Sequence, residues 1–487
     1  MKKLLLLALF LIISQYAVMA SDVKQYEFGG EWYPADPKAL DAQLDSFFAA
    51  AKPAKADGEI LGIISPHAGY VFSGPVAAYG FEAIAGLKVD TVIVMGPTHK
   101  YYFFGVSVYP DGEFATPLGN FKIDEAIAKE FGVLPFVNFD KHNFSGEHSV
   151  EAELPFLKKV MPGVKIVPIV FGDMDYAALS DIAQKLVEIS QKHKILVIAS
   201  SDLSHYLDYD ATNAIDGKTV QLIKDNDSKG LWDIRNDANG RACGINDITA
   251  FLHYVNLRGG KITILKYLNS GDTSGEKGRV VGYVSALASI TAESAKQSEG
   301  QKMEKFSLSD DDKKMLLRIA RETLQNYLVG GKLSKFKTDS KNLNENRGAF
   351  VTLTEHGQLC GCIGRMSADE PLYKVISEMA IAAAVNDPRF PAVRSDELKD
   401  IEIEISVLTP FTIVKNIDDI KVGTHGLMLR KGFNTGVFLP QVPGEQGWDK
   451  KAYLEELGHK AGLSSDAYLD KDSTIYSFEA IVFGENK

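Results

Sequence analysis

The chain has 487 residues, 45% of them hydrophobic and 24% charged, which is ordinary for a globular protein of two or three domains. Its formal net charge is -11 and it has no basic blocks. This composition argues against nucleic-acid binding, which depends on Lys and Arg neutralising phosphates. The three cysteines, Cys243, Cys360 and Cys362, are too few to staple a fold with disulfides, and the odd count leaves at least one thiol unpaired.

The N-terminus has the pattern of a secretory signal. Lysines at positions 2 and 3 precede an apolar run over residues 4–13, and small residues follow at Val18 and Ala20. The pattern predicts a periplasmic or extracellular protein, with residues 1–20 removed by cleavage after Ala20. An uncleaved membrane anchor is the alternative, although the run is short for a spanning helix. No later stretch is long and apolar enough, so we expect no membrane association after cleavage.

Residues 27–290 alternate short, β-branched apolar runs with amphipathic stretches. This alternation predicts a doubly wound α/β domain whose parallel strands are buried on both faces. The expected strands are 60–65, 91–95, 166–170 and 195–200. Two later strands, 262–268 and 280–289, read as additions to the sheet, the second as an edge or closing strand. The expected helices are 124–131, 176–192, 211–225 and 246–257.

The polar stretch 291–305 lacks aliphatic periodicity and is typical of a linker. A second domain, 306–487, begins near Phe306. Ser309 precedes three aspartates and then apolar residues at helical spacing, which predicts a capped helix start. We expect an α+β domain without internal repeats. Its expected strands are 348–354 and 401–408, and its further helices are 371–386 and 450–460.

Histidines follow the expected strands of the first domain at their carboxyl ends. His67 stands just past the first strand, His99 just past the second, and Asp202 with His205 past the fourth. In a parallel sheet these ends share one edge, where such folds bind ligands. Cys243 precedes an expected helix, whose dipole and free amides would lower the thiol pKa and favour thiolate.

His67, His99 and Cys243 would together form a metal site that keeps positions open for water, substrate or O2. Imidazole plus thiolate suits Fe(II), Cu or Zn, and ligand type does not choose among them. Asp202 and His205 are three residues apart, so one helical turn would place them on the same side as a general acid/base pair.

Glu147 and His148 repeat this pairing just before a helix that Ser149 could cap, and they would form another wall of the site.

Each feature also has a simpler interpretation. A histidine after a strand is more often a loop hydrogen-bonding residue, and a lone cysteine such as Cys243 is more often a small buried side chain. We expect Gly69 and Gly74 to let the backbone approach whatever His67 holds. The recurrence of His-bearing turns at strand ends favours the site.

Six motifs in this order resemble the Memo family, the mediator of cell motility and its bacterial relatives: WYPAD from Trp32, SPHAGYVFSGPVAAYGF from Ser65, GPTH from Gly96, EHSVEAELPFL from Glu147, SSDLSHY from Ser200 and CGINDI from Cys243. The family fold is similar to the class III extradiol ring-cleaving dioxygenases, which use non-haem Fe(II). The resemblance implies that His67, His99 and Cys243 are metal ligands, with Asp202 and His205 as the acid/base pair. Cys243 stands where the ring-cleaving enzymes carry a carboxylate. The resemblance therefore implies Cu or Fe redox chemistry as readily as insertion of O2.

The second domain resembles the AMMECR family, the Alport-associated protein and its bacterial relatives, through RGAFVTL from Arg347, GCIG from Gly361, NDPRFPAV from Asn386, IEISVLTP from Ile403 and the segment from His425 to Trp448. Family proteins commonly carry Arg directly before GCIG, where this chain has Cys360, so an anion bound by that Arg would be lost. We expect Cys362 to be buried and structural. The charged residues Asp387, Arg389 and Arg394 could line a cleft, or Asp387 could simply open a turn.

The two families occur together in AmmeMemoRadiSam gene sets, beside a radical-SAM enzyme, and their fusion implies a shared substrate or product. The sequence thus leads us to expect an exported, metal-dependent redox enzyme, dioxygenase-like and using mononuclear Fe or Cu on a small organic substrate. His148, Asp202 and His205 are its expected catalytic residues. The alternatives are a non-catalytic metal- or peptide-binding protein and, more weakly, a zinc-dependent hydrolase.

Overall fold

A computed structural model describes residues 22–485 apart from 54–57, 238–241, 292–305, 332–334, 341, 367–369, 410, 415, 432–433 and 471–472. The expected signal and nearly all of the expected linker lie outside the described residues. None of the described helices combines the length and apolar character needed to cross a membrane. The chain divides into two compact units, one holding most of the chain up to Gln297 and the other Ser298 onward together with residues 132–137 and 174–182.

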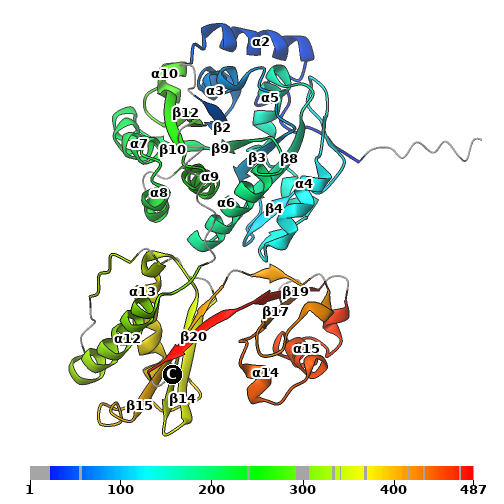
Figure 1. Cartoon of the computed structure of the whole chain (residues 1–487). Coiled ribbons are helices and arrows are strands. Elements are labelled where there is room, and N and C mark those ends of the chain that lie inside the picture. The colour runs from blue at the N-terminus through cyan, green and yellow to red at the C-terminus, as the bar shows by residue number, and fades with distance from the viewer. Residues whose placement is uncertain are drawn as a thin grey trace, which may run out of the picture. The chain divides into compact units, whose positions relative to one another are not determined.

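The first unit is built on a mixed nine-stranded sheet (Figure 1). Its centre is parallel, in the spatial order β2 (Glu59–Ser65), β9 (Ile195–Ser200), β3 (Thr91–Pro97) and β8 (Lys165–Phe171). Antiparallel strands extend it on the β2 side with β12 (Val280–Ile290), β10 (Asp202–Leu207) and β11 (Lys261–Asn269). On the β8 side, β4 (Val106–Val108) pairs antiparallel with β8, and β7 (Val137–Asn138) follows β4 in the sheet order. A small sheet holds β1 (Val23–Lys24), β5 (Glu113–Phe114) and β6 (Phe121–Lys122).

Helices cover both faces of this sheet. Side chains alternate between the two faces along each strand, and the central strands carry buried apolar side chains on both. Ile63 of β2 packs on α3, whereas the neighbouring Gly62 leaves room for the ring of Phe251 on α9. The helices in chain order are α2 (Pro37–Ala50), α3 (Tyr70–Ile84), α4 (Glu125–Glu130), α5 (Leu154–Val160), α6 (Tyr176–Ser190), α7 (Tyr209–Lys224), α8 (Ser228–Asp233), α9 (Ile245–Leu257) and α10 (Ser270–Ser274). The layered α/β arrangement expected for this part of the chain is therefore confirmed.

Three expectations for this unit are wrong. β12 lies between β10 and β2 inside the sheet, not at its edge. The segment from Asp202 is a strand, not a helical turn. Gly74 lies within α3, and the space of its missing side chain is filled by the ring of Phe47, so it serves helix packing and not a ligand. Helix α3 itself was not expected, because burial on most of its sides removes the amphipathic period.

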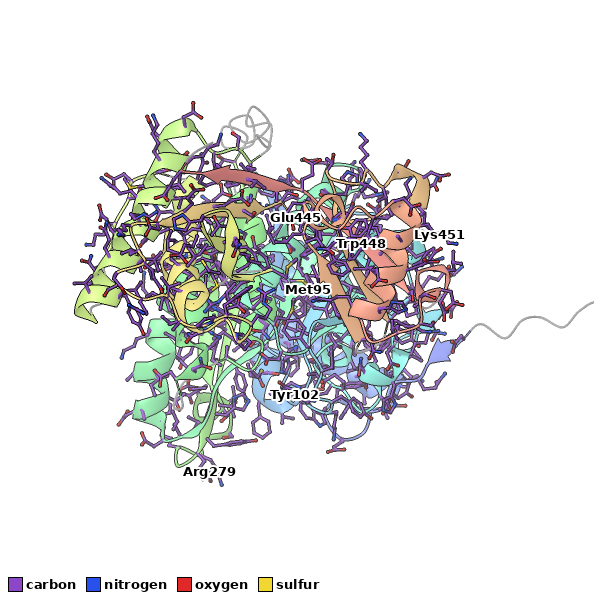
Figure 2. All side chains as sticks on the ribbon, turned by 90° about the horizontal axis from the view of Figure 1, so that it is seen from below. Met95, Tyr102, Arg279, Glu445, Trp448 and Lys451 are labelled. Carbon is purple, nitrogen blue, oxygen red and sulfur yellow. The ribbon has the colours of Figure 1, made fainter. Side chains whose placement is uncertain are left out.

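The second unit combines two four-stranded sheets with helices, as expected for an α+β domain. One sheet runs β14 (Gln358–Arg365), β13 (Ala349–Glu355), β15 (Ile401–Leu408) and β20 (Ala480–Gly484). The other runs β16 (Thr412–Ile413), β19 (Thr474–Phe478), β17 (Gly426–Lys431) and β18 (Asn434–Phe438). The helices are α12 (Asp310–Gly330), α13 (Leu372–Val385), α14 (Val442–Glu445) and α15 (Lys450–Lys460), and Figure 2 shows Trp448 and Lys451 at the start of α15.

Helices α12 and α13 pack on the first of these sheets and close its core. The predicted cap of α12 is confirmed: the Ser309 side chain accepts from the Asp312 N–H, and the Asp312 carboxylate accepts from the Ser309 N–H. Strand β14 was missed because its hairpin turn uses His356 at φ 50° before Gly357, and a histidine there is no common turn signal.

Candidate metal centre

The site forms where the central parallel strands end. His67 follows β2 and His99 follows β3, while Asp202 follows β9, which lies between those two strands in the sheet. The end of β9 is held against the end of β2, since the Ser201 N–H donates to the Ser65 carbonyl over 2.8 Å. The structure therefore brings His67 into contact with Asp202, which lies 135 positions away in the sequence.

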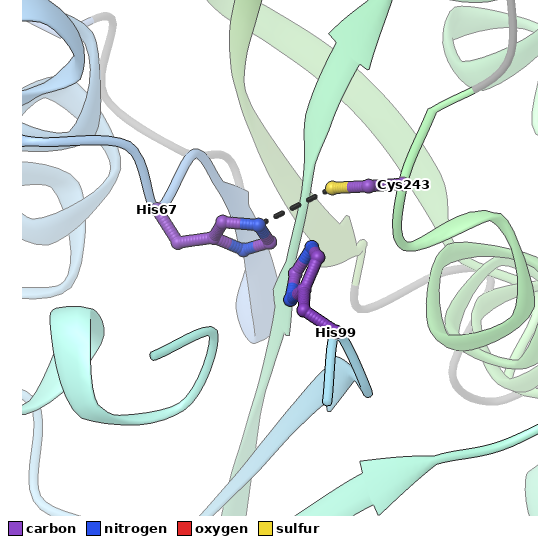
Figure 3. A group of neighbouring side chains, drawn as sticks. All are labelled: His67, His99 and Cys243. Atoms are coloured by element: carbon purple, nitrogen blue, oxygen red, sulfur yellow. Dashed lines mark hydrogen bonds between the residues drawn. The ribbon is translucent and has the colours of Figure 1, made fainter. Parts of the chain in front are cut away.

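His67, His99 and Cys243 converge at this edge from three separate loops (Figure 3). One possible ligand atom from each lies within 4.8 Å of the other two. The Cys243 Sγ and the His67 Nε2 lie 3.2 Å apart. His67 is buried and His99 is exposed, so the site has a closed floor and an open side.

Both imidazoles have their Nδ1 atom engaged by the protein. His67 Nδ1 lies 2.9 Å from the Ser200 Oγ, and His99 Nδ1 lies 2.9 Å from the Glu147 Oε1. Such hydrogen bonds orient a ligand histidine and leave Nε2 as the nitrogen that faces an ion. Two oriented imidazoles and one thiol thus fit a mononuclear transition-metal ion by their chemistry.

The pKa of the Cys243 thiol is shifted in the direction opposite to the one predicted. It lies just before Gly244, the N-cap of α9, and its Sγ accepts from the Asp202 N–H at 3.3 Å. Burial nevertheless raises the pKa of the Cys243 thiol well above its usual value, and the Asp202 carboxyl raises it further. The expectation of a lowered thiol pKa is therefore wrong for the protein without an ion, because desolvation outweighs the helix N-terminus.

Asp202 and His205 share one face of the sheet for an unexpected reason. In the β10–β12 pairing, Asp202 is opposite Tyr283 and His205 is opposite Val281, with a bulge between them. Tyr283 and Val281 are two positions apart on β12, so their side chains lie on the same face of the sheet. Because of the bulge, their partners Asp202 and His205 also lie on that face, although they are three positions apart. Burial raises the pKa of Asp202 to about 7 and lowers the pKa of His205.

His148 and Glu147 form the wall that was expected of them. The His148 ring stacks on the His99 ring with centroids 4.3 Å apart and lies 4.0 Å from the Trp32 ring. Burial lowers the pKa of His148 to about 4, with a further contribution from His99. Burial alone would raise the pKa of Glu147, but hydrogen bonds from His99 and Ser149 lower it. Ser149 does not cap a helix: its hydroxyl donates to the Pro97 carbonyl.

Residues that the sequence did not single out support this wall and floor. Ser200 and Glu153 lie behind His67, and the buried Glu151 carboxyl accepts from the N–H groups of Glu27 and Phe28 and from the Tyr33 hydroxyl. Glu151 thereby anchors the N-terminal segment that carries Trp32. The only available signal was that both glutamates fall inside the EHSVEAELPFL motif.

A family model described as Memo-like protein matches residues 24–287. The chain belongs to the Memo-like protein family. A second family model, described as AMMECR1, matches residues 317–483, so the chain joins a Memo-like domain and an AMMECR1 domain. Both predicted family resemblances are confirmed.

Several known proteins are similar to this Memo-like chain. A MEMO1 family protein of Desulfurococcus amylolyticus is 35% identical over 267 residues, 52% of this chain and 94% of the relative. A MEMO1 family protein of Thermoplasma acidophilum is 33% identical over 263 residues, 54% of this chain and 97% of the relative. The crystal structure of uncharacterized protein PH0010 from Pyrococcus horikoshii is 39% identical, covers 37% of this chain and 93% of that one, and aligns with a TM-score of 0.35.

In the AMMECR1 domain the two neighbouring cysteines have different surroundings. A bulge at Cys360 interrupts the β13–β14 register, and this side chain packs against the core beside α12 and α13. Cys362 is only half-buried, and its sulfur accepts from the Thr352 hydroxyl at 3.3 Å. Cys360 is half-buried as well. The expectation that Cys362 is buried is therefore wrong, and the bulge lets Cys360 contact the core instead.

The three charged residues singled out from the sequence, Asp387, Arg389 and Arg394, fall into two separate ion pairs. The buried Asp387 carboxylate accepts from the Cys362 N–H at 2.9 Å and from the Arg389 guanidinium at 2.7 Å. Arg394 instead pairs with the exposed Asp396. Asp387 therefore joins its loop to β14. The Phe390 N–H also donates to the Asp387 carbonyl, so Asp387 opens a turn, the second of the two interpretations of this segment.

Proposed function

We propose that the Memo-like domain binds one transition-metal ion through His67, His99 and Cys243 and uses it for redox chemistry on a small organic substrate. The observation that carries the proposal is the convergence of three ligand atoms at one sheet edge, with Nδ1 of both imidazoles already held by the protein. Fe(II) and Cu match this donor set, and Zn is a third possibility.

A bound Fe or Cu ion would supply electron transfer or O2 activation, the chemistry of the dioxygenase-like fold that we propose. The chain's own residues supply the rest. His148 stacks on His99, and Trp32 lies against His148, so these rings form an aromatic wall against which a planar substrate can be oriented. Asp202 and His205 face the same side of β10 and are the groups that we assign to proton transfer.

Metal analysis of the protein from its native compartment tests the metal. We expect close to one Fe or Cu per chain in the wild type and loss of this metal in His67→Ala. Metal content unchanged in His67→Ala overturns every metal-dependent version of the proposal. His142→Ala, which alters a histidine outside the three-ligand group, is the matched control and should keep the metal.

Oxygen consumption by anaerobically loaded protein, measured with catechols, thiols and aromatic acids, tests the redox chemistry. We expect turnover with at least one class and a loss of about 100-fold or more in His205→Ala, as for a removed general acid/base. Equal inactivity of wild type and variant across the panel contradicts catalysis.

A second candidate is metal handling without turnover, and the thiol ligand favours it because soft thiolate and imidazole ligands hold Cu(I) well. Copper that survives purification in a protein inactive on every substrate class would select this function.

We also propose export, from the N-terminal pattern alone, and action of both domains on one substrate or product, which a radical-SAM enzyme would supply or consume. N-terminal sequencing of protein from the periplasm and medium tests export. A mature chain starting at Ser21 supports it, and retention of Met1 in the cytoplasm contradicts it.

A further inference from the structure

Ser200, behind His67, has three close polar partners but only one proton. Its Oγ lies 2.7 Å from the Ser149 carbonyl oxygen, 2.6 Å from the Glu153 Oε1 and 2.9 Å from the His67 Nδ1. Ser200 and Glu153 are both buried, so water does not share these contacts. A hydroxyl donates one hydrogen bond and accepts two.

The Ser149 carbonyl fixes how the protons are distributed, because a carbonyl oxygen only accepts. The single proton of Ser200 therefore goes to Ser149. For the two remaining contacts to be hydrogen bonds as well, Ser200 has to accept both, one from the His67 Nδ1–H and one from a protonated Glu153. The opposite end of the His67 ring agrees with this count, since Nε2 lies 3.2 Å from Cys243 Sγ and can accept from a neutral thiol.

We propose that Glu153 is a neutral carboxylic acid and a positioning residue that, through Ser200, keeps the proton of His67 on Nδ1 and presents its Nε2 lone pair to the metal position. The statement about protons holds for the protein without an ion. The statement about metal binding rests on the proposed function.

Burial supports a neutral Glu153. The side chain is only 1% exposed, and desolvation raises the pKa of Glu153 to about 8. The partner of the other imidazole is different, because the pKa of Glu147 is lowered by the hydrogen bonds that it accepts from His99. One metal ligand is thus held by a carboxylate and the other by a neutral hydroxyl, so the hydrogen-bond partner of the His67 ring adds no negative charge beside the ion.

Nitrogen NMR of ¹⁵N-histidine-labelled, metal-free full-length protein tests the proton arrangement, with His67→Ala assigning the signal. We expect His67 as the Nδ1–H tautomer in the wild type and in Glu153→Gln, whose amide also donates to Ser200. In Ser200→Ala we expect a mixture of tautomers. A wild-type His67 with its proton on Nε2 overturns the proposal.

Infrared difference spectra and metal titrations complete the test. The spectrum of wild type minus Glu153→Gln should show the carbonyl band of one protonated carboxyl at pH 7, and a carboxylate band there overturns the proposal. Metal affinity should fall about 10- to 100-fold in Ser200→Ala but stay within about threefold of wild type in Glu153→Gln. A loss above about tenfold in Glu153→Gln would mean that an ionised Glu153 had been removed.

Ser289→Ala is the matched control, because Ser289 is equally buried but pairs with Ile60 at the opposite end of β2. It should leave tautomer and affinity unchanged. If neither wild type nor variants bind metal while the NMR result holds, the proposed function fails and the positioning of His67 by Glu153 and Ser200 stands.

Discussion

At the scale of single residues, each candidate metal ligand is held by a hydrogen-bond partner from elsewhere in the chain. His99 is tied to Glu147 through both its ring and its main chain, and His67 is tied to Ser200. Cys243 receives a main-chain N–H from Asp202. None of these partners is next to its ligand in the chain, so each ligand is oriented by a different part of the fold.

Glu147→Gln should weaken metal binding by about 10- to 100-fold, because the amide cannot accept from the His99 ring, the His99 N–H and the Ser149 N–H together. Competition titration with a chelator measures the affinity. Glu130→Gln, at the end of α4, is the control and should bind like wild type, because Glu130 pairs with Lys192 and His193 and not with a candidate ligand. Unchanged affinity in Glu147→Gln would show that the orientation of His99 does not matter.

Asp387→Asn should destabilise the AMMECR1 domain by about 2 kcal/mol at pH 7, because the carboxylate accepts charge-assisted hydrogen bonds from Arg389 and Cys362. The Arg389 guanidinium holds the pKa of Asp387 well below its usual range, so this stabilisation is present above about pH 4 and is lost as the pH falls through the native pKa.

Urea unfolding of Asp387→Asn and wild type at several pH values checks this, and the difference between them should shrink below about pH 4. The exposed Asp396→Asn is the control and should leave stability unchanged. A difference that is constant down to pH 2 would contradict the assignment.

At the scale of elements, strand ends and bulges place the functional side chains. Parallel β2, β9 and β3 deliver His67, Asp202 and His99 to one edge, and the bulge in β10 turns His205 to the face of Asp202. A second bulge, at Cys360 in β14, decides which of two neighbouring thiols meets the core. One extra residue in a strand moves every following side chain to the other face of the sheet. A bulge therefore decides which side chains reach the site or the core.

Ser309→Ala should destabilise the AMMECR1 domain by about 1 kcal/mol, because it removes the side-chain acceptor of the N–H of Asp312 at the start of α12. Thermal unfolding followed by circular dichroism measures the change. Ser307→Ala, an exposed serine before the helix, is the control. Equal stabilities of Ser309→Ala and wild type would show that the capping box contributes nothing.

At the scale of the whole molecule, the chain joins two units that each have their own hydrophobic core. The Memo-like core gathers around the central parallel strands and α3, and the AMMECR1 cores gather around α12 with α13 and around α15. All three candidate metal ligands belong to the first unit. Metal binding should therefore stabilise one unit alone.

Calorimetry should show two unfolding transitions, and metal at about 100 times its Kd should stabilise only the Memo-like transition, by about 2.7 kcal/mol. His67→Ala should abolish this shift without altering the AMMECR1 transition. An equal shift of both transitions would contradict independent unfolding of the two units.

The sequence by itself determined the two family domains, most of the central strands and helices, and the capped start of α12. These features depend on local signals, such as apolar runs, helical periodicity and motifs of several residues, that each segment carries alone. It also predicted that His67, His99 and Cys243 belong to one site. Strand ends in an α/β sheet place the two histidines on one edge, and the start of a helix together with the family resemblance singled out Cys243.

Only the tertiary structure decided the protonation and surroundings of those residues. Burial raised the thiol pKa of Cys243, the β10 bulge aligned His205 with Asp202, and Ser200 and Glu153 came to lie behind His67. Desolvation, bulges and contacts between distant segments arise when the whole chain packs, so no stretch of sequence read alone contains them.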